Sequence, residues 1–198
     1  MFKLIGVGLL LAAGTSASAE EMQQSDLFTA LKGGGYVIYL RHASTESDYA
    51  DQVTAVPNDC ATQRVLSESG WQQARVIGKA IKDLAIPVSE VFSSEYCRAW
   101  QTADLAFGSY EKKAALNFEP AEEYSAEQTA KMRTNVMPFL TAPTLAQGNR
   151  VIVGHDDPFE AATGIYPEPQ GVAYVLKSDG KGGVEVLGHI DPDAWPAS

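Results

Sequence analysis

Residues 36–46 read YVIYLRHASTE, and they place a cation and an imidazole at the end of an apolar run. The run from Tyr36 to Leu40 is rich in β-branched and aromatic residues, which predicts a short buried strand. Arg41 and His42 follow it directly. In open α/β sheets, ligands bind beyond the carboxyl ends of the strands. The stretch therefore predicts both a strand and a candidate site at its end.

Strand-like and helix-like segments alternate along most of the remaining chain. Short apolar runs predict further strands at residues 88–94, 150–155, 171–176 and 183–190. Apolar residues at helical spacing predict helices within residues 25–32, 66–87, 95–108 and 125–140. This order predicts an α/β fold of three layers: a mainly parallel sheet with helices on both faces and an antiparallel C-terminal hairpin.

The clearest helix signal lies in residues 66–87. Ser67 is the expected N-cap, and Pro87 marks the exit from the helix. Five apolar residues recur at helical spacing and are expected to face the core: Trp71, Ala74, Ile77, Ile81 and Leu84.

The N-terminal residues 1–19 have the layout of a secretory signal peptide. Lys3 precedes an apolar run over residues 4–13, and small residues end the segment at Ala19. The run is too short for a mature transmembrane helix, although an uncleaved anchor is the alternative. We expect residues 20–198 to form a single exported domain, periplasmic or secreted, with no stable membrane insertion after cleavage of the signal.

Charge and cysteine content restrict the partners. The formal net charge is −10, which argues against nucleic acid as a partner. A small phosphorylated substrate is compatible with it, because a local cluster of arginines can override the global field. The chain has two cysteines, Cys60 and Cys97. In an oxidising compartment they are a candidate disulfide, with two buried free thiols as the alternative.

Further candidate site residues follow two of the other predicted strands. Arg98 comes shortly after the second strand, and His155 ends the third. Taken singly, a histidine at a strand end is more often structural, and an arginine on a helix is usually solvated. Together with Arg41 and His42 they converge on one edge of the sheet. Arginines bind phosphate oxygens in pairs, and a histidine beside the phosphate can attack it.

Three motifs, LRHASTE, SSEYCRAWQTADLAFG and VIVGHDD, resemble those of the histidine phosphatase superfamily, also called phosphoglycerate-mutase-like. The resemblance implies that His42 is a nucleophile that forms a phosphohistidine. It also implies that Arg41 and Arg98 clamp the phosphate and that His155 stabilises the transferring group. No cofactor and no metal are expected. Ala43 stands where the family usually has glycine.

The resemblance leaves the proton donor open. One branch of the family has an aspartate directly after the second histidine, which here is Asp156. The other branch uses a glutamate in the middle insert, where this chain has Glu122 and Glu123. Asp156 is the first choice, with Asp157 expected to cap the helix that follows.

Two basic residues have weaker assignments. Arg64 either adds a cation to the pocket or is a solvated loop residue. His189 is expected to be structural.

The sequence thus predicts an exported phosphomonoesterase. Resemblance and compartment point to a small periplasmic phosphate ester or an envelope glycan phosphate. The alternatives are a phosphomutase and a non-catalytic phosphate-binding envelope protein on the same fold. The sequence makes no prediction about oligomeric state.

Overall fold

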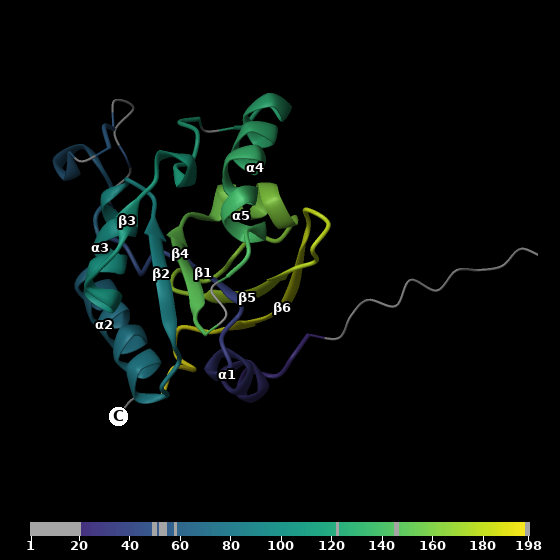
Figure 1. Cartoon of the computed structure of the whole chain (residues 1–198). Helices are drawn as coiled ribbons and strands as arrows, with labels where there is room; N and C mark the ends of the chain where they lie inside the picture. The colour runs from purple at the N-terminus through teal and green to yellow at the C-terminus, as the bar shows by residue number, and fades with distance from the viewer. Residues whose placement is uncertain are drawn as a thin grey trace, which may run out of the picture.

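A computed structural model describes residues 21–48, 51, 55–57, 59–121, 123–144 and 147–196 (Figure 1). The predicted signal peptide, residues 1–19, lies outside these ranges. Within them, no helix is both long and apolar enough to cross a bilayer.

One six-stranded sheet forms the centre of the fold, in the order β3-β2-β4-β1-β5-β6. The strands are β1 (Val37–Arg41), β2 (Val88–Ser93), β3 (Glu111–Lys112), β4 (Asn149–Gly154), β5 (Ala173–Ser178) and β6 (Val184–Ile190). The first four strands run parallel, whereas β5 is antiparallel to both β1 and β6. The mainly parallel sheet with its antiparallel C-terminal hairpin is therefore confirmed. The edge strand β3 was not predicted, because two residues are too short to show a pattern.

Helices cover both faces of this sheet, which confirms the three layers. They are α1 (Gln24–Lys32), α2 (Glu68–Asp83), α3 (Cys97–Phe107), α4 (Ala126–Thr141) and α5 (Asp156–Thr163). Figure 1 shows α2 and α3 on one side of the sheet and α4 and α5 on the other. Alternate β1 residues enter the two cores. Ile38 packs with α1, α2 and α3, and Tyr39 with α4 and α5. A strand buried on both faces explains the unbroken apolar run in the sequence.

Helix α2 begins as predicted but turns a different residue inward. Ser67 caps it by accepting a hydrogen bond from the Gly70 backbone N–H, at 3.1 Å. The expectation that Trp71 faces the core is wrong, since this residue is 42% exposed and packs beside Arg75. The inward position one turn before Ala74 is occupied by Gly70, against which the backbone of Ser44 lies directly. No side chain fits there.

We therefore expect Gly70→Ala to destabilise the protein by about 3 kcal/mol, as overpacking does. A Cβ at this position would lie only 1.9 Å from the Ser44 carbonyl oxygen. Helix propensity alone predicts the opposite sign, a gain of about 0.5–1 kcal/mol for alanine over glycine. Urea unfolding measures the change, with Trp71→Ala as the control on the exposed side. A stabilised Gly70→Ala protein would contradict the close approach.

Candidate active site

Parallel pairing brings three strand ends together at one edge of the sheet. His42 follows β1, Ser94 follows β2 and His155 follows β4, and these strands are neighbours in the order β2-β4-β1. Both histidines are fully buried, and their ring centroids are 5.4 Å apart. Arg98, in the first turn of α3, reaches the same point and donates from Nε to His42 Nε2, at 3.1 Å.

The hydrogen bonds of His42 define its tautomer. Its Nδ1 lies 2.9 Å from the Ala43 carbonyl oxygen, which can only accept, so Nδ1 carries the proton. Nε2 then keeps its lone pair and points toward Arg98. Burial, followed by the charge of Arg98, lowers the pKa of His42 well below its usual value. The imidazole is therefore neutral at neutral pH, the form in which it is a nucleophile. Ala43 is absent from the residues with positive φ, so it needs no glycine conformation.

His155 is held from both its backbone and its ring. Tyr39 donates its hydroxyl to the His155 carbonyl, at 2.7 Å, and accepts the His155 N–H, at 3.1 Å. The ring atom Nε2 lies 2.9 Å from Ser94 Oγ, and that hydroxyl is itself donated to Asn117 Oδ1. The Asn117 amide group is fixed in turn because its Nδ2 donates to Glu95. Nε2 of His155 is thus the donor to Ser94, and Nδ1 faces the site.

Three arginines lie at this cluster. Arg41 and Arg98 are 5% and 4% exposed. Arg64 is half-buried with its Nε buried, and its charge lowers the pKa of both His42 and His155. It is therefore not a fully solvated loop residue.

Several buried nitrogen atoms at this point have no partner within the described part of the chain. They are the N–H groups at Arg41 Nε and Arg64 Nε and the unprotonated ring atom Nδ1 of His155. Buried polar groups normally have a hydrogen-bond partner, so unpartnered ones call for an explanation. The two guanidinium N–H groups, together with an imidazole nitrogen that becomes a donor once it is protonated, form a cradle suited to an anion with several oxygens.

The candidate proton donors lie in different environments. Asp156 accepts hydrogen bonds at Oδ2 from Arg41 Nη2, at 2.6 Å, and from the Tyr166 hydroxyl, at 2.7 Å. Glu123 is exposed, and Glu122 lies outside the described residues.

The prediction that Asp157 caps the helix is wrong. Helix α5 begins two residues earlier than that, with His155 at the N-cap position and Pro158 as the third helical residue. Asp157 instead accepts a hydrogen bond from the Tyr124 hydroxyl, at 3.0 Å, and burial raises its pKa.

Sequence reasoning missed three contacts of the site. Asp51 pairs with Arg98, Asn117 orients Ser94, and the ring of Tyr166 packs on Arg41 at 5.3 Å. All three lie in segments between strands and helices, where no periodic pattern predicts which way a side chain points.

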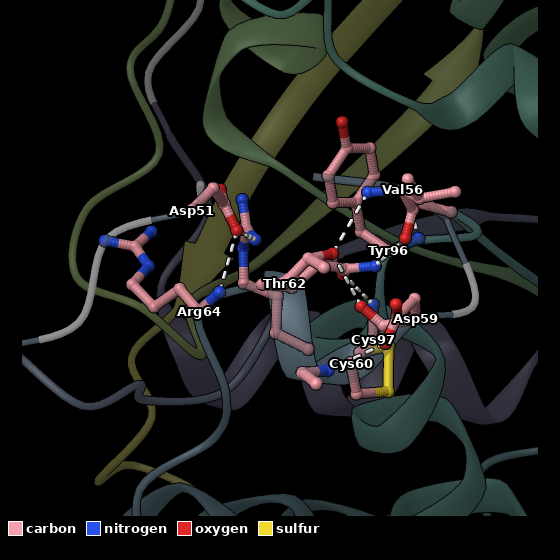
Figure 2. Close-up of a disulfide and its surroundings, with 12 residues drawn as sticks. Asp51, Val56, Asp59, Cys60, Thr62, Arg64, Tyr96 and Cys97 are labelled. Atoms are coloured by element: carbon pink, nitrogen blue, oxygen red, sulfur yellow. Dashed lines mark hydrogen bonds and ion pairs between the residues drawn. A yellow bond between two sulfur atoms is a disulfide. The ribbon is translucent and has the colours of Figure 1, made fainter. Parts of the chain in front are cut away.

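The predicted disulfide between Cys60 and Cys97 is confirmed (Figure 2). It joins the short helix at Cys60–Thr62 to the first residue of α3, beside Arg98. The fully buried Gln63 strengthens this junction, because its Oε1 accepts the Cys97 N–H at 2.7 Å. Figure 2 shows Arg64 on the same segment, hydrogen-bonded through its backbone to Asp51. The bond thus holds Arg64 near the buried histidines.

We expect the Cys60→Ser/Cys97→Ser protein to lose about 4 kcal/mol of unfolding free energy, from the chain-entropy cost of the open loop. It should also bind inorganic phosphate more weakly, because Arg64 is no longer held in place. Titration calorimetry measures the affinity. Arg64→Ala should weaken binding strongly when the disulfide is present and only slightly when it is absent. If the losses of phosphate affinity from Arg64→Ala and from removal of the disulfide were additive, the disulfide would not act through Arg64.

Comparisons with known proteins agree with this geometry. Residues 37–122 match the family model described as the histidine phosphatase superfamily (branch 1). No curated protein matches the chain significantly.

Solved structures share the fold at low identity. A phosphoserine phosphatase mutant from Entamoeba histolytica, in complex with phosphoserine, has 14% identity and a TM-score of 0.57, and the match covers 80% of this chain and 98% of that one. The protein TTHB049 from Thermus thermophilus has 22% identity and a TM-score of 0.54, with 79% and 99% covered. The protein histidine phosphatase SixA, complexed with tungstate, has 15% identity and a TM-score of 0.50, with 80% and 97% covered.

Proposed function

Because residues 37–122 match the model of the histidine phosphatase superfamily (branch 1), we propose that the chain hydrolyses phosphoric monoesters through a phosphohistidine on His42. The single observation that carries the proposal is the state of this imidazole. Its Nδ1 proton is held by the Ala43 carbonyl, and its Nε2 lone pair faces Arg98 in a cradle of unpartnered N–H groups. A neutral, fixed imidazole beside an anion site is poised for attack on phosphorus.

The reaction has two displacements at phosphorus. First, His42 Nε2 attacks the phosphoryl group, the P–O bond to the alcohol breaks, and the leaving oxygen takes a proton from a carboxylic acid. Water then attacks the phosphohistidine and gives a proton to the same carboxylate, the P–N bond breaks, and inorganic phosphate leaves with the imidazole and the carboxylic acid restored. Arg41, Arg64 and Arg98 hold the phosphoryl oxygens through both steps, so positioning and charge neutralisation do most of the work.

His155 stabilises the charge that gathers on those oxygens. Burial and the charge of Arg98 lower the pKa of His155, which keeps the ring neutral. A phosphate dianion in the cradle offsets the positive charge of Arg98. It thereby favours a proton on His155 Nδ1, the atom without a partner among the described residues. The ring then donates from Nδ1 to phosphate while Nε2 stays hydrogen-bonded to Ser94.

Asp156 is the proposed proton donor. It follows His155 directly and its carboxylate contacts Arg41, so it lies at the clamp itself. Its Oδ2 accepts two hydrogen bonds, which directs a proton to Oδ1. Asp157 is the neighbouring candidate, because burial raises its pKa as a general acid requires. Glu123 is exposed and would need to move to reach the site.

We further propose that the protein is exported to the periplasm or secreted. The layout of residues 1–19 supports this, and so does the Cys60–Cys97 disulfide, because such bonds persist in oxidising compartments. In that setting the substrate is a small phosphate ester or a phosphate on an envelope glycan.

The nucleophile assignment predicts that the protein without residues 1–19 hydrolyses p-nitrophenyl phosphate with a chelator present. His42→Ala should lower kcat by about 10³-fold or more, because it removes covalent catalysis. Arg41→Ala should mainly raise KM. His189→Ala, a change on β6 outside the site, is the matched control.

A labelled ester tests the intermediate itself. Labelled phosphate should stay on the protein when the reaction is stopped with base and should be lost in acid, as expected of a phosphohistidine. Full activity in His42→Ala would falsify the mechanism.

The proton-donor assignment predicts a selective defect in Asp156→Asn. Cleavage of an alkyl phosphate should fall by about 10²-fold or more, because its leaving oxygen needs the proton. Cleavage of p-nitrophenyl phosphate should change little, since its leaving group is a weak base. Steady-state assays with both esters measure the ratio. A selective defect in Asp157→Asn or Glu123→Gln instead, with Asp156→Asn unselective, would assign the acid to that residue.

A further inference from the structure

Carboxylates meet the clamp arginines at the mouth of the site. Asp51 pairs with Arg98 Nη1 at 3.0 Å, and Asp156 with Arg41 Nη2 at 2.6 Å. The third, Glu168, lies 3.8 Å from Arg41 Nη1, and its side chain is 71% exposed whereas that of Arg41 is 6% exposed. Glu168 therefore lies on the solvent side of the clamp. Of the three carboxylates it is the most exposed, so an approaching substrate meets it first.

An aromatic ring lies beside this carboxylate. Tyr166 is 46% exposed, which makes it one of the few exposed large apolar side chains in the described part of the chain. Its ring packs on the Arg41 guanidinium, 5.3 Å from the centroid, and its hydroxyl donates to Asp156. Because its pKa is raised to about 12, the phenol stays uncharged at physiological pH. The ring is thus a fixed, neutral surface at the entrance.

The two parts of a phosphate monoester have different positions in this site. The phosphoryl group belongs in the buried cradle, where Arg41 Nε, Arg64 Nε and His155 Nδ1 have no other partner among the described residues. The alcohol must then extend outward, because His42 attacks from the side opposite the leaving oxygen. The alcohol therefore passes the ring of Tyr166 and the carboxylate of Glu168.

We propose that Tyr166 and Glu168 determine the leaving group: they accept an uncharged polyhydroxylated alcohol and reject an alcohol that carries its own anionic group. The inference rests on the proposed phosphatase activity and specifies its substrate class. An aromatic ring offers apolar contact area to the C–H face of a polyol, and a carboxylate accepts hydrogen bonds from its hydroxyls. A second anion on the alcohol would lie near Glu168 without a partner, and such like-charge contacts select against the wrong ligand.

Two three-carbon phosphate esters test whether Glu168 rejects an anionic leaving group, since only one of them carries a carboxylate on its alcohol. The wild-type protein should hydrolyse glycerol 3-phosphate with a kcat/KM about tenfold or more above that for 3-phosphoglycerate. Glu168→Gln should bring this ratio close to one by raising activity toward 3-phosphoglycerate, and Glu168→Lys should invert it. The residue is exposed, so neither change should affect folding.

Glu185→Gln is the matched control, because it removes the same charge elsewhere. Glu185 lies on β6, opposite Lys177 of β5 in the strand register. This is the end of the sheet where β1 begins, away from the strand ends that form the site. In the Glu185→Gln protein, the ratio of kcat/KM for glycerol 3-phosphate to that for 3-phosphoglycerate should stay at the wild-type value. If Glu185→Gln shifts the ratio as much as Glu168→Gln, the effect is the net charge of the protein and the proposal is wrong.

Tyr166 has a separate test. Tyr166→Ala should lower kcat/KM for glucose 6-phosphate about tenfold further than for methyl phosphate, which is too small to reach the ring. Tyr166→Phe keeps the ring and loses the hydrogen bond to Asp156, so it should lower both values to the same extent and keep the wild-type ratio between the two esters. Equal losses on both esters would mean that the ring only supports Arg41.

The outcomes separate this inference from the proposed function. If methyl phosphate and p-nitrophenyl phosphate are both inert, the phosphatase proposal fails and this inference fails with it. If methyl phosphate is hydrolysed while the wild-type protein turns over 3-phosphoglycerate as well as glycerol 3-phosphate, only the inference fails.

Discussion

The parallel register of β1 against β4 is the constraint on which the site depends. Arg41 pairs with Gly154, so strands β1 and β4 end at the same level of the sheet. The residues that follow them, His42 and His155, therefore lie next to each other. A shift of one residue would turn one of these side chains to the other face of the sheet. Gly154 protects the register, because a Cβ there would lie 2.3 Å from the hydroxyl of Tyr39. That same hydroxyl binds the backbone of His155 on both sides.

A second constraint is electrostatic. The chain has a net charge of −10, yet Arg41 and Arg98 are almost fully buried beside two neutral histidines. Burying a cation is costly unless it is paired. Carboxylates at the mouth supply the pairing without entering the cradle, so the inner N–H groups are left for an anion. The same acidic groups that stabilise the clamp therefore also shape the field that a substrate crosses.

Much of the fold followed from the sequence because β1, β2, β4, β5 and β6 are short apolar runs with clear ends. The candidate residues at those ends were found by the same logic, since topology rather than side-chain detail brings strand ends together. The disulfide was predicted from the count of two cysteines and the expected oxidising compartment. The prediction for Trp71 was wrong because helical spacing indicates only which side of a helix is apolar. The close approach of the Ser44 backbone decides that Gly70, rather than Trp71, faces inward in the first turn.

The contacts that the sequence did not predict have a common cause. Asp51, Asn117 and Tyr166 lie in connecting segments, where direction is set by distant parts of the chain rather than by local periodicity. The start of α5 is a related case. Asp157 was expected to cap it, but the helix begins at Asp156 because the chain turns directly out of β4 with His155 as its N-cap.

This joint between β4 and α5 has a consequence for how the protein could be altered. Only His155 lies between the strand and the helix, and Tyr39 binds both its N–H and its carbonyl, so its backbone is held firmly. Tyr166 and Glu168 instead project from the connection between α5 and β5, whose side chains meet solvent. Of these two side chains, Tyr166 is tied to the reacting residues through Asp156 and Arg41, whereas Glu168 meets only the solvent side of the clamp. A designer could therefore exchange Glu168 to change substrate preference while leaving the reacting atoms in place.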